Sequence, residues 1–371
     1  MNGNPLHTRL CEEYGVEYPI VAFAHTKDVI AAVTNAGGIG VLGALSMEPE
    51  EIRSAVHWIR ERVGDKPFGV DLLLPASFVE GNIEDLEAQI PEGHREFVRR
   101  LKADNNIPDP KKERSFDAAG VGPEMLRRSR AQLDVVLEER VPIFASALGS
   151  PAFLMERARE AGTKIWGLIG LPRQARREIE AGVDVVIAAG SDSGGHSGSI
   201  GTFSLVPEVA KLAEGTHTLV LAAGGVTTGR HLAAALALGA DGVWCGTIWQ
   251  ATNESETEMF FKEQLLRSNS EDAVQSRAST GKPVRQIRSK WSEAWRQPGA
   301  PEPLPMPLQP MLVANIQQAI KDHHLENWQG TPSGQGVGHI TAIKPARQVV
   351  SDMVEEAEDT LDGLQLDPLG V

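Results

Sequence analysis

The sequence of 371 residues predicts an α/β fold, a (β/α)8 TIM barrel with an insertion after the third strand and a C-terminal extension. Eight short apolar runs alternate with amphipathic segments of helical periodicity. Several of these segments end in glycine just before the next apolar run, as helices do before a strand. An eighth strand can pair with the first, so a closed barrel leaves no exposed sheet edge.

The apolar runs are rich in β-branched residues and short enough to be buried parallel strands. They occupy residues 18–23, 39–42, 68–74, 142–146, 164–169, 183–188, 218–223 and 242–248. The helical segments occupy residues 28–35, 50–62, 125–139, 152–160, 173–180, 206–213, 229–238 and 254–267. Helix-ending glycines stand at Gly37, Gly162, Gly182 and Gly239.

Two segments do not fit the repeat, residues 75–123 and 268–371. The first follows the carboxyl end of a strand, the face where barrel enzymes place their sites, so it is expected to cover a ligand as a cap or subdomain. The second contains a proline-rich stretch at 297–310, three tryptophans and an acidic helical segment at 345–364. We expect a barrel over residues 1–267, a helical extension over 268–371, and the acidic helix on the outside of the barrel.

Composition excludes several classes of protein. A net charge of −14 argues against nucleic-acid binding, which needs a basic face. No apolar stretch reaches the ~18 residues of a membrane span, and the N-terminus lacks a signal pattern. The two cysteines, Cys11 and Cys245, offer no disulfide framework, and no residues show metal-ligand spacing. These features predict a soluble cytoplasmic protein without a metal site.

The most informative segment is the glycine-rich run 190–198, which places His196 directly after a buried strand. An imidazole with an unperturbed pKa near ~6.5 can accept a proton from a weak carbon acid or hydrogen-bond an anion at neutral pH. Asp192 is expected to cap the turn. His25, after the first strand, reaches the same face and is the competing base or a substrate contact.

Glycines also mark the ends of the seventh and eighth strands, at Gly224-Gly225 and Gly246-Thr247. Barrels commonly bind phosphate at these two positions, through backbone N–H groups and a helix end. The alternative is that these glycines only form tight turns. The chain has no dinucleotide or nucleoside-triphosphate glycine motif, so the phosphate is expected to belong to a mononucleotide cofactor or a phosphorylated substrate.

Taken together, these motifs resemble the nitronate monooxygenases, formerly called 2-nitropropane dioxygenases, which are FMN-dependent barrel enzymes. The matching segments are NAGGIGVLG at 35–43, GGHSG at 194–198, AAGGV at 222–226, GADGV at 239–243, and Gly246-Thr247. The resemblance covers most of residues 18–255. It is specific for the wider flavoprotein group and less so for one reaction.

The resemblance implies FMN as cofactor and His196 as catalytic base or substrate partner. The implied cofactor-binding residues are Ala22, Phe23, Ala24, Asp71, Ala189, Gly194, Gly195, Gly224, Gly225, Trp244, Cys245, Gly246 and Thr247. The family usually has asparagine where Asp71 stands and glutamine where Ala189 stands. It usually has proline and methionine at the positions of Ala22 and Phe23. These departures predict altered flavin contacts or a different substrate.

The implied reaction is oxidation of a nitronate by O2, giving a carbonyl compound and nitrite. Another small anion or carbon acid is the alternative substrate. His196 would deprotonate a neutral nitroalkane or hold the anion. Two alternatives on the same barrel are an NAD(P)H-dependent flavin enoyl-thioester reductase and a quinone reductase. A flavin-storing or scaffold protein is the non-enzymatic alternative. A homodimer is a candidate assembly.

Overall fold

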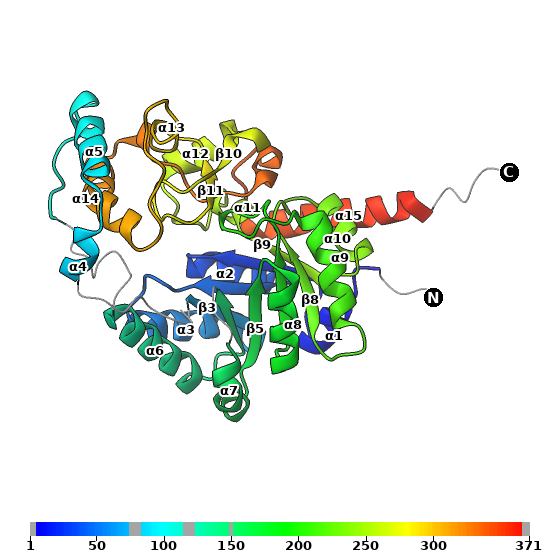
Figure 1. Cartoon of the computed structure of the whole chain (residues 1–371). Helices are drawn as coiled ribbons and strands as arrows, with labels where there is room; N and C mark the ends of the chain where they lie inside the picture. Colours follow the sequence, from blue (N-terminus) through cyan, green and yellow to red (C-terminus); the bar gives the residue numbers. More distant parts are fainter. Residues whose placement is uncertain (1–4, 74–82, 114–122, 148–150, 366–371) are drawn as a thin grey trace.

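The computed structural model describes residues 5–73, 83–113, 123–147 and 151–365. At its centre, eight parallel strands form a closed barrel, which confirms the predicted fold (Figure 1). Register pairs such as Val21 with Trp244 join the last barrel strand to the first. The barrel strands, in order, are β1 (Ile20–Ala24), β2 (Ile39–Gly43), β3 (Phe68–Leu73), β4 (Ile143–Ala147), β5 (Lys164–Ile169), β6 (Val185–Ala189), β8 (Leu219–Ala223) and β9 (Gly242–Cys245).

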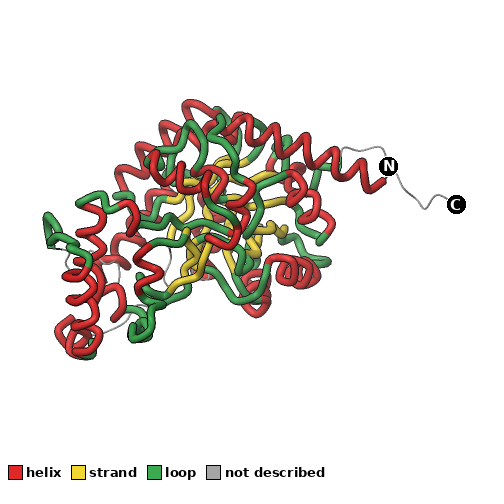
Figure 2. The backbone as a smooth tube through the Cα atoms, turned by 90° about the horizontal axis from the view of Figure 1, so that it is seen from above, coloured by secondary structure: helices red, strands yellow, loops and turns green. Residues whose placement is uncertain are grey.

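Helices follow the strands and surround the barrel, as the view from above shows (Figure 2). They are α2 (Lys27–Asn35), α3 (Pro49–Val63), α6 (Pro123–Glu138), α7 (Met155–Ala161), α8 (Pro172–Ala181), α9 (Thr202–Ala213), α10 (Gly229–Ala237), the short α11 (Thr247–Gln250) and α12 (Met259–Arg267). The turn η2 (Pro151–Leu154) precedes α7. Residues 74–82 and 114–122, nearly all of which belong to the predicted insertion 75–123, lie outside the described part of the chain.

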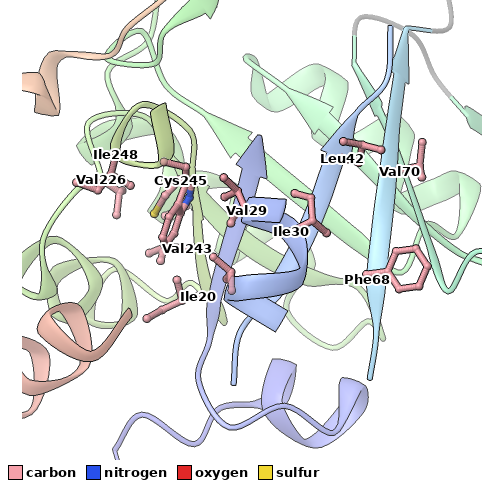
Figure 3. Close-up of a cluster of buried hydrophobic side chains, with 14 of the residues drawn as sticks. Ile20, Val29, Ile30, Leu42, Phe68, Val70, Val226, Val243, Cys245 and Ile248 are labelled. Atoms are coloured by element: carbon pink, nitrogen blue, oxygen red, sulfur yellow. The ribbon is translucent and has the colours of Figure 1, made fainter. Parts of the chain in front are cut away.

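Strand side chains alternate between two apolar layers, because successive residues of a strand point to opposite faces. Val29 and Ile30 of α2 pack on outward-facing strand residues such as Ile20 and Leu42 (Figure 3). Inward-facing residues form a second cluster inside the barrel, with Trp166 as its largest fully buried member. The interior of the barrel is therefore filled with side chains.

An aromatic series runs through the interior from one end of the barrel to the other. At the amino end, α1 (Arg9–Tyr14) places the Tyr14 hydroxyl 2.7 Å from the indole Nε1 of Trp166, which donates to it. Trp166 contacts Trp244, with ring centroids 6.3 Å apart. Trp244 in turn stacks on Phe23 at 5.5 Å, and Phe23 meets His25 edge-on at 5.1 Å. The series therefore fixes Phe23 and His25 at the mouth.

The insertion and the extension share a small core outside the barrel. The helices α4 (Ile83–Ala88) and α5 (Glu92–Asp104) pack against α14 (Leu308–Asp322), and Figure 1 shows α5 and α14 side by side. Phe97 of α5 meets Trp295 edge-on at 4.9 Å. Trp291, Trp295 and Trp328 are all buried in this cluster. Two segments far apart in sequence are thereby tied together.

The last helix, α15 (Ala346–Gln365), packs on α10 and α2, so the acidic helix lies on the outside of the barrel as predicted. At Gly229 the two helix backbones approach so closely that an added Cβ would lie 2.3 Å from the Met353 carbonyl oxygen. Only glycine allows this crossing. Within the described residues, no helix has the length and apolarity needed to cross a membrane.

Several predicted boundaries were wrong by a few residues. Residues 247–250 form α11 and not the end of a strand, because the backbone at Gly246 turns into the helical region and its carbonyl accepts from Trp249 N–H. Residues 254–258 are not helical; α12 begins at Met259, and Lys262 donates to two carbonyls of the preceding loop. Helix α9 begins a turn earlier than predicted, at Thr202.

Candidate active site

His196 lies on a short strand that leaves the barrel. After β6, residues Gly195–His196 form β7, which pairs antiparallel with β11 (Val284–Ile287) of the extension. Strand β11 also pairs with β10 (Ala273–Ser276), giving a three-stranded sheet beside the barrel. In this sheet His196 is the register partner of Val284. The predicted site loop is therefore held by residues from the C-terminal extension.

The turn between β10 and β11 positions the His196 imidazole. Its Nε2 lies 3.1 Å from Thr280 Oγ1, and the Thr280 hydroxyl donates to the Lys282 carbonyl at 3.2 Å. Because that hydroxyl proton is already used, His196 Nε2 is the donor, and Nδ1 is left as the basic nitrogen. Desolvation lowers the pKa of His196, and the positive charge of Lys282 lowers it further. The neutral imidazole therefore predominates at neutral pH.

The side chain of Asp192 contacts the start of α9, and no bond from it to the turn before His196 is seen among the described residues. Its Oδ2 accepts the Thr202 N–H at 2.7 Å, which satisfies the first turn of α9. Below the same loop, the buried Arg285 donates through Nε to the Ser191 carbonyl at 2.9 Å and through Nη1 to the Ala273 carbonyl. One guanidinium therefore joins the loop after β6 to the hairpin.

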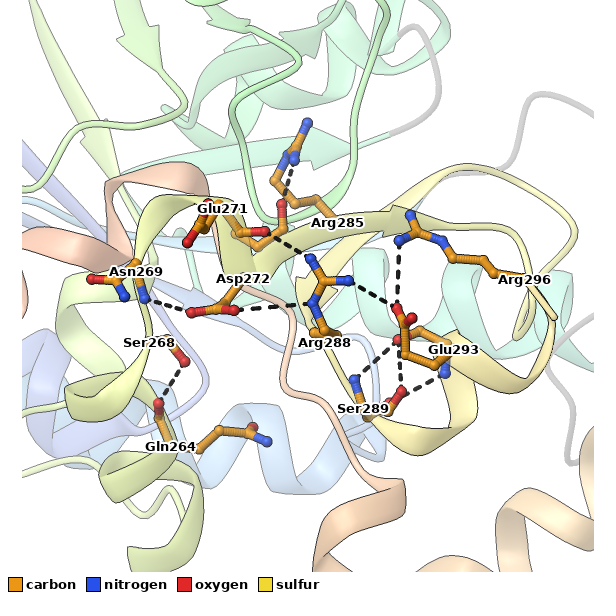
Figure 4. Close-up of polar contacts among 12 residues, drawn as sticks. Gln264, Ser268, Asn269, Glu271, Asp272, Arg285, Arg288, Ser289, Glu293 and Arg296 are labelled. Atoms are coloured by element: carbon orange, nitrogen blue, oxygen red, sulfur yellow. Dashed lines mark hydrogen bonds and ion pairs between the residues drawn. The ribbon is translucent and has the colours of Figure 1, made fainter.

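Figure 4 shows that Arg285 points away from a second, more exposed polar cluster around Arg288. Arg288 pairs with Glu293 of α13 (Lys290–Ala294) at 3.1 Å and donates to the Glu271 carbonyl at 3.2 Å. Asp272, in the turn η3 (Ser270–Asp272), accepts the Asn269 N–H at 2.8 Å. This cluster fixes the end of the β10–β11 hairpin that lies opposite its turn.

Glycines with open space beside them follow the carboxyl ends of β8 and β9, which are neighbours in the barrel. Gly225 has a φ of 74°, and a Cβ there would meet only Asp192 Cβ, at 3.5 Å. A Cβ at Gly246 would meet only Phe23, at 3.8 Å. The Ser193 hydroxyl is buried, has no partner among the described residues, and lies 2.7 Å from the Cβ position of Gly224. Open backbone and a spare hydroxyl fit a phosphate group.

The N-terminus of the helix that follows β8 is not directed at these glycines. The first N–H of α10, at Gly229, donates to Glu356 Oε2 of α15 at 2.8 Å. Thr228 accepts from His231 N–H as the N-cap. The short helix α11 begins instead directly after Gly246.

The extension contributes a second glycine-rich segment that the sequence analysis missed. Gly334 N–H donates to Thr247 Oγ1 at 2.9 Å, and Gln335 N–H donates to the Asp192 carbonyl at 2.9 Å. Ser333 is fully buried, and its hydroxyl has no partner in the described structure. The alternating glycines at 334, 336 and 338 were a signal that could have found this segment, which continues into η5 (Gln335–His339).

Asp71 points into the barrel mouth from β3. Its register partners are Gly43 on one side and Ala145 on the other, and its side chain is 7% exposed. The Oδ2 atom has no partner among the described residues. Burial without a neighbouring cation raises the pKa of Asp71 to about 8.

The remaining predicted residues are distributed around this mouth. His25 is exposed, and its Nδ1 lies 2.8 Å from the Gly43 carbonyl, so that nitrogen is the donor. Ala189 and Trp244 face the barrel interior. Ala22 and Cys245 face the surrounding helices, so only their backbones are directed to the mouth. Burial raises the pKa of Cys245 to about 12, which makes its thiol unreactive.

Comparison with known proteins identifies the family. The Nitronate monooxygenase family matches residues 5–356. The chain belongs to this family. Rv1533 of Mycobacterium tuberculosis, which carries the name of a monooxygenase, is 43% identical over 97% of this chain and 99% of its own length. A probable nitronate monooxygenase of Staphylococcus aureus is 27% identical over 94% of this chain and 96% of its own length.

Two solved structures share the fold over nearly the whole chain. A nitroalkane oxidase of Streptomyces ansochromogenes superposes with a TM-score of 0.74 at 27% identity, covering 96% of this chain and 99% of that one. FabK of Thermotoga maritima gives a TM-score of 0.73 at 29% identity, covering 96% and 98%. This member of the nitronate monooxygenase family is a flavin-dependent oxidoreductase. Among the described residues, no three side chains of metal-ligand type gather into a site.

Proposed function

We propose that this family member binds FMN and oxidises small nitronates, or nitroalkanes that it first deprotonates, with O2 to a carbonyl compound and nitrite. The observation that carries the proposal is the contact of His196 Nε2 with Thr280, which leaves Nδ1 without a hydrogen-bond partner among the described residues. His196 lies on the loop after β6, and Asp192 of the same loop lies beside Gly225.

The residues at the mouth fit FMN. Gly225 and Gly246 leave room for a phosphate, and the buried Ser193 hydroxyl is available to donate to it. Phe23, stacked on Trp244, provides an apolar surface for a planar ring, and Asp71 offers an unsatisfied polar atom. When bound, the flavin supplies an electron acceptor that can be reoxidised by O2.

The chain's own residues handle the proton and the charge. His196 Nδ1 accepts the proton from the carbon next to the nitro group, and Thr280 keeps the ring in the required tautomer. The resulting nitronate is an anion, so it is attracted by protonated His196 and by Lys282. A substrate that is already anionic needs no deprotonation, and only the attraction of its negative charge is required.

The test begins with the absorbance spectrum of the purified protein, reconstituted with FMN if necessary. The protein is then mixed anaerobically with nitroalkane, nitronate or NADH in separate experiments. We expect rapid bleaching of the flavin with nitronate, and formation of nitrite once O2 is admitted. Absence of flavin binding after addition of FMN would overturn the cofactor assignment.

The second candidate is an NAD(P)H-dependent enoyl-thioester or quinone reductase. The likeness to FabK at 29% identity and a TM-score of 0.73 favours it as the alternative. Rapid bleaching by NADH, with none by nitronate, would replace the first proposal by this one.

A further inference from the structure

The carboxyl group of Asp71 is not explained by the fold. We propose that Asp71 acts toward the flavin as a neutral carboxylic acid, whose O–H donates a hydrogen bond to the ring. Loss of that proton at mildly alkaline pH then weakens flavin binding and makes the flavin harder to reduce. This inference rests on the proposed binding of FMN.

The position of Asp71 in β3 directs its side chain inward. Val70 and Leu72, on either side of it, belong to the outer layer that packs on the helices. Because strand side chains alternate, Asp71 faces the interior. Its inward-facing register partner Ala145 is apolar, and Gly43 has no side chain. Neither neighbour can satisfy the buried Oδ2 atom, which has no hydrogen-bond partner among the described residues.

Among the described residues, no cation offsets a negative charge on the Asp71 carboxyl. The inward-facing residues on β4, β5, β6, β8 and β9 that belong to the interior cluster are apolar or tryptophan. The titratable neighbour across β2 is His25, and its Nδ1–H is directed to the Gly43 carbonyl. Burial is the cause of the raised pKa, which lies at about 8. At neutral pH the protonated form of Asp71 therefore predominates.

The two forms of this side chain have opposite effects on a neighbouring ring. A protonated carboxyl can donate a hydrogen bond, whereas a carboxylate only accepts. A buried carboxylate also repels the negative charge that a flavin gains on reduction, and a low local dielectric strengthens that repulsion. Asparagine is the matched replacement, because its amide donates at every pH.

The first experiment titrates FMN into the apoprotein from about pH 6 to about pH 9.5, and follows the flavin fluorescence. For the unchanged chain we expect the Kd for FMN to rise about tenfold across this range, which corresponds to ~1.4 kcal/mol. For Asp71→Asn the Kd should not change with pH. The midpoint reduction potential of the bound flavin should fall more steeply with pH in the unchanged protein than in the variant.

Asp241→Asn is the control. Asp241 is a second carboxyl whose pKa is raised by burial, but it precedes β9 at the opposite end of the barrel and accepts the Val220 N–H at 2.9 Å. This variant should keep the pH dependence of the unchanged protein. If the unchanged protein and Asp71→Asn bound FMN with equal affinity at every pH, the proposed role of Asp71 would be overturned. The proposal that the protein binds FMN would still stand.

A second measurement needs no flavin. Between about pH 4 and about pH 8, the folded chain holds a proton on Asp71 that the unfolded chain has released, so ionisation opposes folding as the pH rises. The free energy of unfolding of the apoprotein should therefore fall with pH relative to that of Asp71→Asn. If the free energy of unfolding depended on pH in the same way in both proteins, the proposal that Asp71 is a neutral carboxylic acid would be overturned. Failure to bind FMN at any pH would instead overturn the proposed function and the flavin contact with it.

Discussion

The Nε2 atom of His196 lies 3.1 Å from Oγ1 of Thr280, a residue 84 positions further along the chain. This contact joins the loop after β6 to the β10–β11 hairpin and fixes which nitrogen of the imidazole is basic. The proposed base is therefore oriented by the extension and not by the barrel alone.

Replacing His196 by asparagine should separate proton transfer from flavin binding. We expect kcat/KM for a neutral nitroalkane to fall by about 10²-fold or more, since a positioned base commonly contributes that much. The preformed nitronate needs no deprotonation and should lose far less. FMN affinity should be unchanged within about twofold. Steady-state kinetics with both substrates are the measurement, and equal losses for the two would contradict the assignment of His196 as base.

Replacing Lys282 by methionine should change the pH profile. The charge of Lys282 helps to lower the pKa of His196, so its removal raises that pKa. Because only the neutral imidazole accepts a proton, the acidic limb of kcat/KM for a nitroalkane should move to higher pH. The KM for an anionic nitronate should rise about two- to fivefold, as expected for the loss of an exposed charge pair.

Lys290→Met is the matched control for this variant, because Lys290 is an exposed lysine of the same extension, on α13. Its pH profile should coincide with that of the unchanged enzyme. An unshifted profile in Lys282→Met would show that this lysine does not act on His196.

Gly246→Ala tests the proposed position of the phosphate without straining the fold. The backbone at Gly246 has a φ of −118°, and an added Cβ would meet only Phe23, at 3.8 Å. The free energy of unfolding of the apoprotein should therefore change by less than ~0.5 kcal/mol. The methyl group occupies space expected to hold the phosphate, so the Kd for FMN should rise about tenfold or more.

Gly93→Ala is the control for this substitution, since an added Cβ at Gly93 in α5 would meet nothing within 4 Å. It should not weaken FMN binding, and it should not lower stability, because alanine favours a helix more than glycine does. Unchanged FMN binding in Gly246→Ala would place the phosphate elsewhere.

The barrel itself could be predicted from the sequence, because its signals are local. The β-branched runs and the glycines that stop the helices, such as Gly162 and Gly182, act within one strand-helix unit. All eight predicted strands exist, and β5 has the predicted bounds. The errors occurred at the ends of strands and helices. After β9, for example, a single backbone turn at Gly246 decides between strand and helix.

The surroundings of His196 could not be predicted in the same way. Its position after the sixth barrel strand follows from the repeat, but the pairing of β7 with β11 depends on residues nearly a hundred positions away. Thr280 and Arg285 sit in segments without periodicity or a recognised motif. Non-local pairing of this kind is determined by packing, and a single sequence carries little record of it.

Arg285 supplies the last prediction, because it connects the two parts of the site from below. Its guanidinium donates to the carbonyls of Ser191 and Ala273, and it is 9% exposed. Arg285→Met keeps the apolar volume but leaves two carbonyl oxygens without donors. A buried unsatisfied group costs ~1–3 kcal/mol, so the free energy of unfolding should fall by about 2–4 kcal/mol.

Arg288→Met on the same hairpin is the contrasting variant. The Arg288 side chain is 43% exposed, and water can replace its contacts with Glu293 and Glu271. We expect a loss of at most ~1 kcal/mol for it, as for other surface pairs. Because the Arg285 contact also holds the loop that carries His196, Arg285→Met should weaken FMN binding as well, whereas Arg288→Met should not. Urea unfolding and FMN titration of both variants are the measurements. Equal stability losses, with FMN affinity preserved in both, would show that the loop after β6 keeps its shape without Arg285.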